Sequence, residues 1–373
     1  MRTKDDLRIL QALPLDIKIR MTVRRLMDWI SYYGEDGVYL SWSGGKDSTV
    51  LRHIIMQEWP DVVSVFVNTG LEYPEIQQFV KAAQKRGEPV EILRPKMRFD
   101  EVIKKHGYPV IGKKQAEDVS LARKNIKAGK YTIRLRNLGI MPDQAEEMGL
   151  SLPGKEMLER YERTCKGSKY YAKKYSKLID ADFQVSAYCC EVMKKGPARE
   201  YQKRSGKTPI LATMASESMM RESAWLSNGC NSFDSKKPRS APMSFWTEQD
   251  VLEYIKTYNV EIPSVYGDVV YAEEPEQMRI EEVGVDIGFD KLCTTGCHRT
   301  GCIFCAFGAH IQNGSGADRF LRLKRTHPRQ YAYCIGGGEY NEDGIWQPNK
   351  DGLGMGHVFD EINRLYGDGF IKY

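Results

Sequence analysis

The feature that most constrains the fold is the six-residue segment SGGKDS at Ser43–Ser48, which lies between the apolar run 37–42 and a helical-looking segment, 49–55. A strand that passes through a Gly-Gly turn into a helix forms an anion cradle. The glycines permit positive φ and close backbone approach, and the first N–H groups of the helix point at the anion. A lysine adds a mobile charge and serines add hydroxyl donors. The spacing differs from the nucleotide-triphosphatase P-loop and from the dinucleotide fingerprint. We therefore predict a phosphate site, against a plain glycine-rich turn, at Ser43, Gly44, Gly45, Lys46, Asp47 and Ser48.

Apolar runs and helical periodicity alternate around this loop, which predicts an α/β fold. A leading amphipathic helix is expected over 16–33. Strands are expected over 38–42, 62–67, 89–93 and 210–213, and helices over 49–59, 75–87, 248–259 and 357–366. Such alternation is typical of a doubly wound parallel sheet, whose ligands bind at the carboxyl ends of the strands. Ser43 and Asn68 fall at two such ends, and Thr247 is a candidate N-cap.

A basic stretch interrupts the alternation. Residues 101–205 carry 23 Lys plus Arg against 13 Asp plus Glu, a net of +10, so the rest of the chain sums to −5. Basic residues interleaved with aromatic ones suit nucleic acid, and the alternative is a solvated helical face. The residues concerned are Lys104, Lys105, Lys113, Lys114, Arg123, Lys124, Lys127 and Lys130, with Tyr131, Tyr161, Tyr170, Tyr171 and Tyr175. We expect a helical segment at 1–36, a nucleotide-binding half at 37–98, a basic helical insertion at 99–180, the rest of the main domain at 181–308 and a C-terminal extension at 309–373.

The cysteines point to a metal site rather than to disulfides. Nine cysteines in 373 residues are too sparse for a disulfide scaffold, and the number is odd. The sequence shows no run of 18 apolar residues and no signal peptide, so we expect a cytoplasmic protein without membrane contact. The vicinal pair Cys189-Cys190 and the distant Cys302-x-x-Cys305 offer four thiolates. Adjacent cysteines suit an iron-sulfur cluster better than a single zinc ion, and free thiols are the third alternative.

Several motifs of the sequence together resemble those of a known family. SGGKDS resembles the PP-loop of the ATP pyrophosphatase superfamily, and the vicinal pair with a distant CxxC resembles the iron-sulfur branch of the phosphoadenylylsulfate (PAPS) reductase family. Asn68–Glu75, Ala215–Arg221 and Phe245–Val251 resemble further motifs of that family, in order, between Gly37 and Gly308. The resemblance implies an adenine nucleotide alpha hydrolase-like fold and a 4Fe-4S cluster on Cys189, Cys190, Cys302 and Cys305. It also implies cleavage of ATP between its α and β phosphates, with Lys46, Asp47 and Arg221 in catalytic roles. The nucleotide would further contact Asn68, Thr69, Gly70, Glu72 and Glu217.

Two departures from the family pattern shape the functional expectation. The PP-loop is intact, which favours ATP over PAPS, and the chain ends 368-DGFIKY-373 without the catalytic cysteine of the reductases' C-terminal tail. Cys230 lies in a Gly-Asn turn and is a candidate sulfur carrier, or else a small buried thiol. Asp47 is a candidate ligand of Mg²⁺, or else a carboxylate at a helix start. Cys293 and Cys297 are alternate ligands, a redox pair or neither.

We therefore expect an ATP-dependent enzyme that forms AMP and pyrophosphate and activates an acceptor for sulfur transfer. A nucleic-acid acceptor is expected, as in DNA phosphorothioation and tRNA thiolation, with a sulfur donor or cysteine desulfurase as partner. The alternatives are a sulfite-releasing PAPS or adenylylsulfate reductase and a non-catalytic subunit that binds nucleic acid or a partner. The acceptor, the donor, three- against four-cysteine ligation and any homo-oligomer stay open.

Overall fold

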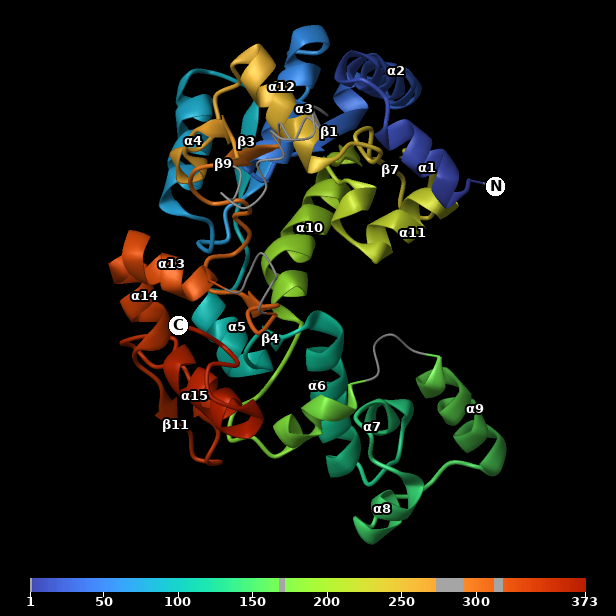
Figure 1. The fold of residues 1–373 in the computed structure, drawn as a ribbon, viewed down its shortest axis with the longest axis vertical. Helices are drawn as coiled ribbons and strands as arrows, with labels where there is room; N and C mark the ends of the chain where they lie inside the picture. Colours follow the sequence, from blue (N-terminus) through green and yellow to red (C-terminus); the bar gives the residue numbers. More distant parts are fainter. Residues whose placement is uncertain (1, 168–171, 273–290, 312–317) are drawn as a thin grey trace, which may run out of the picture. The chain divides into compact units, whose positions relative to one another are not determined.

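The computed structural model describes residues 2–167, 172–272, 291–311 and 318–373 (Figure 1). The chain divides into two compact units that are each described separately. Unit 1 comprises Met1–Asn68, Glu72–Arg94 and Pro197–Gly301, and unit 2 comprises Thr69–Leu71, Pro95–Gly196 and Cys302–Tyr373. The predicted insertion and the predicted C-terminal extension therefore contribute to one compact unit. The five predicted segment boundaries stay predictions.

Unit 1 is built on a six-stranded sheet with the order β3-β2-β1-β5-β7-β6. The strands are β1 (Val38–Ser41), β2 (Ser64–Val67), β3 (Val90–Leu93), β5 (Thr208–Ile210), β6 (Asn231–Ser232) and β7 (Arg239–Ser240). All neighbours pair in parallel except β6, which runs antiparallel to β7. The strand order reverses direction at β1, and this kind of switch point is where open α/β sheets bind ligands. The predicted doubly wound α/β fold is confirmed.

Helices pack around this sheet in unit 1. They are α1 (Lys4–Gln11), α2 (Leu15–Tyr33), α3 (Lys46–Glu58), α4 (Pro74–Lys85), α10 (Gly196–Ser205), α11 (Met219–Asn228) and α12 (Glu248–Tyr258), with the short turns Glu35–Gly37, Ala215–Glu217 and Ser264–Tyr266 and the hairpin of β8 (Val269–Tyr271) and β9 (Leu292–Thr294). Tyr39 and Val65 on the sheet pack against Tyr201 of α10. Val38 and Leu40 alternate with Tyr39 along β1 and are also fully buried, so both faces of the strand are covered.

Unit 2 is mostly helical. Its helices are α5 (Phe99–His106), α6 (Lys113–Lys127), α7 (Ile133–Asn137), α8 (Pro142–Glu147), α9 (Lys155–Lys166), α13 (Arg319–Thr326), α14 (Pro328–Ile335) and α15 (Met355–Tyr366), with a 3-10 segment at Lys173–Ile179 and a π-helix at Glu191–Lys195. Two short ladders join distant segments: β4 (Val110–Ile111) with β10 (Ala306–Phe307), and β11 (Glu339–Tyr340) with β12 (Trp346–Gln347). The β4–β10 pair brings the segment after Cys305 beside the start of the predicted insertion.

Most predicted elements form within a few residues of the expected bounds. Thr247 caps α12 as predicted, and Asp250 completes a capping box. α3 begins at Lys46, three residues before the predicted start, because the loop residues themselves make its first turn. β5 begins at Thr208 and includes Pro209, so the predicted strand 210–213 is displaced toward the N-terminus. Among the described residues, no helix is long and apolar enough to cross a membrane.

Candidate functional site

The two glycines of the predicted phosphate loop are required by close packing. Gly44 has φ +70°, and a Cβ there would lie 2.6 Å from the Ile76 Cγ2 of α4. Gly45 has ordinary backbone angles and caps α3, but a Cβ on it would lie 3.1 Å from the Tyr266 hydroxyl. The positive φ therefore explains the glycine at position 44, and the close approach of the Tyr266 hydroxyl explains the glycine at position 45.

Hydrogen bonds between the two serines close the loop. The Oγ atoms of Ser43 and Ser48 lie 2.9 Å apart, and the Ser43 N–H donates to Ser48 Oγ at 3.2 Å. The Ser48 hydroxyl also lies 3.0 Å from the carbonyl oxygen of Gly45, to which it donates. The loop is therefore held in shape by its own side chains.

Lys46 is buried between two carboxylates. Its side chain is 3% exposed, and its Nζ lies 3.2 Å from Asp47 Oδ1 and 3.0 Å from Glu248 Oε1. Burial alone would lower the pKa of the Lys46 ammonium, but Asp47 and Glu248 outweigh burial and raise the pKa above its ordinary value. The ammonium is thus charged and positioned at the start of α3.

Arg221 and Glu217 lie in the same polar group. Both Arg221 and Arg299 form ion pairs with the Glu217 carboxylate, which also accepts the Met214 N–H at 3.0 Å. Burial and the neighbouring Arg299 lower the pKa of Arg221, and the charge of Asp47 opposes this shift. Arg221 is therefore electrostatically coupled to Asp47, as a role at the loop requires. Its guanidinium is paired with Glu217 in this structure.

Two residues of the loop's surroundings were missed by the sequence analysis. The Lys46 backbone N–H donates to the Tyr266 hydroxyl at 3.1 Å, and this hydroxyl lies 3.0 Å from Thr300 Oγ1. Tyr266 is 2% exposed. No motif marks either residue, because they reach the loop from segments more than 200 positions downstream.

The predicted nucleotide contacts that follow β2 are divided between the units. Asn68 continues β2, where its N–H donates to the Leu93 carbonyl at 2.8 Å, and it belongs to unit 1 together with the buried Glu72. Thr69 and Gly70 belong to unit 2, and Gly70 has φ +75°. The sheet topology therefore brings Asn68 to the same edge as the loop.

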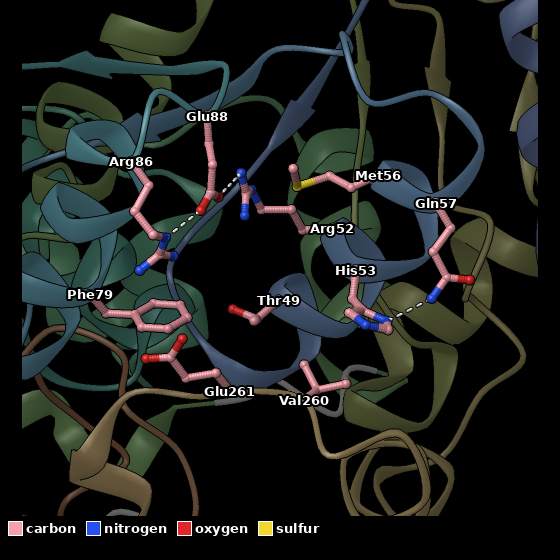
Figure 2. A pocket seen from close by; sticks show the side chains of 10 residues that line it. All are labelled: Thr49, Arg52, His53, Met56, Gln57, Phe79, Arg86, Glu88, Val260 and Glu261. Carbon is pink, nitrogen blue, oxygen red and sulfur yellow. Dashed lines mark hydrogen bonds and ion pairs between the residues drawn. The ribbon is translucent and has the colours of Figure 1, made fainter.

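A hollow of about 300 Å³ lies along α3, and Glu88 with its two arginine partners lines one part of its wall (Figure 2). Glu88 accepts one guanidinium on each oxygen, from Arg86 at 2.6 Å and Arg52 at 2.6 Å. Arg52 is buried, donates from Nε to Ser64 Oγ at 3.0 Å and stacks 4.5 Å from the Trp42 ring. These pairs join α3 to β2 and to the turn before β3. They stabilise the helix whose first turn forms the loop.

The CxxC segment of unit 2 is anchored by its two central residues. Ile303 and Phe304 are buried, and Phe304 stacks on Phe99 of α5 with ring centroids 6.4 Å apart. The Cys305 N–H donates to the Cys302 carbonyl at 3.1 Å, which makes a tight turn. Burying the apolar pair fixes the backbone that carries both cysteines.

The vicinal cysteines stand at the start of the π-helix 191–195, a rare backbone class that is frequent at functional sites. A hydrogen bond to Cys190, burial and the neighbouring sulfurs of Cys305 and Cys302 raise the pKa of Cys189. That hydrogen bond, helped by Lys113 and Lys194 and opposed by burial, lowers the pKa of Cys190. The four predicted cysteines therefore form one electrostatically coupled group in unit 2, which we call the four-thiol group.

The four thiols of this group do not converge on a single metal ion in the described part of the chain. Within the described ranges, no three His, Cys, Asp or Glu side chains are arranged to hold one metal ion. A four-iron cluster takes one thiolate at each of several separated irons, so its ligands need not converge on one point. Lys113 and Lys194 would offset its negative charge. Ile111, two residues before Lys113, has φ +66°, a strained backbone for a β-branched residue.

Comparison with known families covers the loop and strands β1, β2 and β3 of the sheet. Residues 37–142 match the family model described as the phosphoadenosine phosphosulfate reductase domain. This range, which includes the phosphate loop, is therefore similar to a PAPS reductase domain. Members of this family are enzymes of sulfur metabolism that bind nucleotides. The matched range ends before Cys189, so it does not extend to the iron-sulfur branch.

The chain also resembles a solved structure. This is a crystal structure of phosphoadenylyl-sulfate (PAPS) reductase from Candida auris in a phosphate complex, with 14% identity over 71% of this chain and 91% of that one and a TM-score of 0.34. A likeness this distant carries no argument about function. Comparison with curated proteins gives no match.

Three further cysteines, Cys230, Cys293 and Cys297, lie outside the four-thiol group. Cys230 is 8% exposed, accepts a hydrogen bond from Ser244 Oγ at 3.1 Å and borders a separate hollow of about 510 Å³ with Arg2 and Trp225. Cys293 lies in β9, and the buried Cys297 follows it in unit 1. The sulfur-carrier role predicted for Cys230 stays a prediction.

The predicted basic surface divides into two kinds of residue. Lys104, Lys105, Lys113, Lys124, Lys127 and Lys130 are exposed. In contrast, Arg123 donates to the carbonyls of Leu178, Ile179, Ala181 and Phe183, and Lys114 pairs with the buried Asp118. Tyr131 and Tyr175 are buried, so neither can stack on a base, and Tyr161 packs toward Tyr131. Tyr170 and Tyr171 lie outside the described residues.

Proposed function

We propose that the loop Ser43–Ser48 binds ATP and that the protein cleaves it to AMP and pyrophosphate while activating an acceptor for sulfur transfer. The acceptor oxygen attacks the α-phosphorus, the bond to the bridging oxygen breaks and pyrophosphate leaves. The adenylated acceptor then exchanges AMP for sulfur from a donor.

One observation carries the proposal: the buried, charged Lys46 is held at the first turn of α3 in an intact loop of a PAPS reductase domain. An ammonium fixed in a dry site stabilises the charge that builds on the leaving pyrophosphate, a preorganised term worth several kcal/mol. Asp47 and Glu248 already neutralise this ammonium, so Mg²⁺ bound by Asp47 would accompany the incoming phosphates. Arg221, paired with Glu217, would exchange that partner for a phosphate oxygen.

We further propose that Cys189, Cys190, Cys302 and Cys305 hold a 4Fe-4S cluster. Such a cluster supplies electron transfer or a site for sulfide when bound. The coupled thiols, the neighbouring Lys113 and Lys194 and the π-helix that begins after Cys190 support this assignment.

Nucleic acid is the proposed acceptor. The exposed lysines of α5 and α6, together with Lys130, support it, because clustered lysines attract phosphates without reading sequence. Tyr131 and Tyr175 give no such support, because both are buried.

The family match favours a second candidate, a reductase that releases sulfite from PAPS or adenylylsulfate. This reaction needs a thiol nucleophile, and Cys230 is the candidate within unit 1. The burial of Cys230 argues against this thiol as the nucleophile and therefore for the ATP reaction.

Product analysis separates the two candidates. Anaerobically purified protein is incubated with Mg-ATP and, in parallel, with PAPS plus a dithiol reductant. Formation of AMP and pyrophosphate in equal amounts from ATP supports the proposal. Where ATP cleavage is coupled to sulfur transfer, both products form only when the acceptor is present. Sulfite from PAPS with no turnover of ATP establishes the reductase instead. Salt-sensitive nucleic-acid binding without either turnover would leave a non-catalytic subunit.

A further inference from the structure

The hydroxyl of Tyr266 occupies a hydrogen-bonding position at the phosphate loop. It accepts the Lys46 N–H, the first amide of α3, at 3.1 Å. An N–H is a single donor, so it cannot serve the tyrosine and a phosphate with full strength at once. Gly45 makes the approach feasible, since a Cβ there would lie 3.1 Å from the same oxygen.

We propose that Tyr266 is an internal substitute for a phosphate oxygen and that binding of the nucleotide's phosphates displaces its hydroxyl from the Lys46 N–H. This inference rests on the proposed function of the same loop and names the residue that sets its affinity. Thr300 Oγ1, 3.0 Å from the hydroxyl, keeps a partner for it after displacement. Tyr266 is therefore a positioning residue that satisfies the loop when it holds no ligand.

Displacement of Tyr266 also affects a second segment of unit 1. The turn that carries Tyr266 is bonded to the segment 295–297: the Gly296 N–H donates to the Tyr266 carbonyl at 2.8 Å, and the Cys297 N–H to the Val265 carbonyl at 2.9 Å. Gly296 packs tightly against the turn that carries Tyr266, because a Cβ on Gly296 would lie 2.5 Å from the Val265 carbonyl oxygen. A shift of Tyr266 therefore moves the backbone around Cys297, whose thiol is buried.

The test compares pyrophosphate binding by wild type and Tyr266→Phe, measured by calorimetry with Mg²⁺. The phenylalanine keeps the ring and removes the competing acceptor, so the free Lys46 N–H is left unsatisfied until a phosphate arrives. Affinity for pyrophosphate then rises about threefold to tenfold, the size of one neutral hydrogen bond. The KM for ATP falls by a similar factor, whereas a merely structural role would lower affinity together with stability.

Tyr254→Phe is the matched control. Tyr254 is equally buried in unit 1, and its hydroxyl contacts His53 Nδ1 at 2.9 Å rather than the loop. Its pyrophosphate affinity stays at the wild-type value. As a second readout, pyrophosphate raises the rate at which Cys297 is alkylated, read at peptide level, in wild type.

The outcomes separate this inference from the function on which it rests. Tighter pyrophosphate binding by Tyr266→Phe without any ATP cleavage supports Tyr266 as the substitute and sinks the proposed reaction. ATP cleavage by wild type with unchanged or weaker binding by Tyr266→Phe overturns the role of Tyr266 alone. Absence of pyrophosphate binding in both proteins overturns both.

Discussion

The phosphate loop of unit 1 and the four-thiol group of unit 2 both bury reactive groups, but they differ in how those groups are compensated. In the loop every strong charge has a partner from the protein: Lys46 has Asp47 and Glu248, and its N–H has Tyr266. In the four-thiol group the hydrogen bond between the vicinal thiols, burial and the neighbouring sulfurs raise the pKa of Cys189, whereas the same hydrogen bond lowers the pKa of Cys190.

The difference teaches which region depends on a bound group. Paired charges are compensated in the free protein, so the loop keeps its shape before a nucleotide arrives. Under the proposed cluster assignment, bound metal would complete the four-thiol group, because clustered thiolates repel one another until a cation binds. The proposal therefore makes the loop preformed and the four-thiol group dependent on metal.

The largest effect is expected from removing one ligand of the four-thiol group. Cys302→Ser lowers the iron and sulfide of anaerobically purified protein from about four per chain to near zero, because a hydroxyl is a poor iron ligand. Iron and acid-labile sulfide assays measure this. Cys165→Ser is the control, since Cys165 is buried in unit 2 and bonds to Asn137 Oδ1 at 3.1 Å, outside the group. Equal loss of iron in both variants would refute the ligand assignment.

The second-largest effect is expected from removing the Lys46 charge from the phosphate loop. Lys46→Ala removes the buried cation between two carboxylates and lowers the rate of ATP cleavage about 100-fold or more. Pyrophosphate release gives the rate. Lys256→Ala removes an exposed lysine of α12 that lies over the Tyr271 ring, and it should leave the rate unchanged. Full turnover by Lys46→Ala would contradict the mechanism.

Arg123 and Lys124 of unit 2 are neighbours of like charge, but we expect only Arg123 to stabilise the fold. Arg123→Ala frees four backbone carbonyls in the segment 178–183 and lowers the free energy of unfolding by about 3 kcal/mol. Lys124→Ala, at an exposed position, changes it by less than about 0.5 kcal/mol. Thermal unfolding in iron-loaded protein provides the comparison. Similar losses in the two variants would show that Arg123 is not a structural residue.

The smallest effect concerns the exposed lysines. The double change Lys127→Ala with Lys130→Ala weakens nucleic-acid binding by a few fold and reduces the slope of log affinity against log salt by about two. Fluorescence anisotropy at several salt concentrations provides the slope. An unchanged slope would remove these lysines from the proposed interface.

The sequence predicted the sheet well because the sheet depends on local signals. Alternating apolar runs place β1, β2 and β3, and the Thr247 capping box places α12. Tyr266 and Thr300 were not predicted, since they reach the loop only through the tertiary fold. Tyr131 and Tyr175 were expected to stack on bases, but packing buries them. Charge counting likewise could not separate the structural Arg123 from the exposed Lys124.

The most direct test of the account is to titrate ATP, with Mg²⁺, into the iron-free Cys302→Ser protein and into iron-loaded wild type. A preformed loop predicts dissociation constants that agree within about twofold, because the partners of Lys46 all come from unit 1. Loss of ATP binding in the iron-free protein, with unit 1 still folded by thermal unfolding, would contradict the claim that the loop is complete without the four-thiol group.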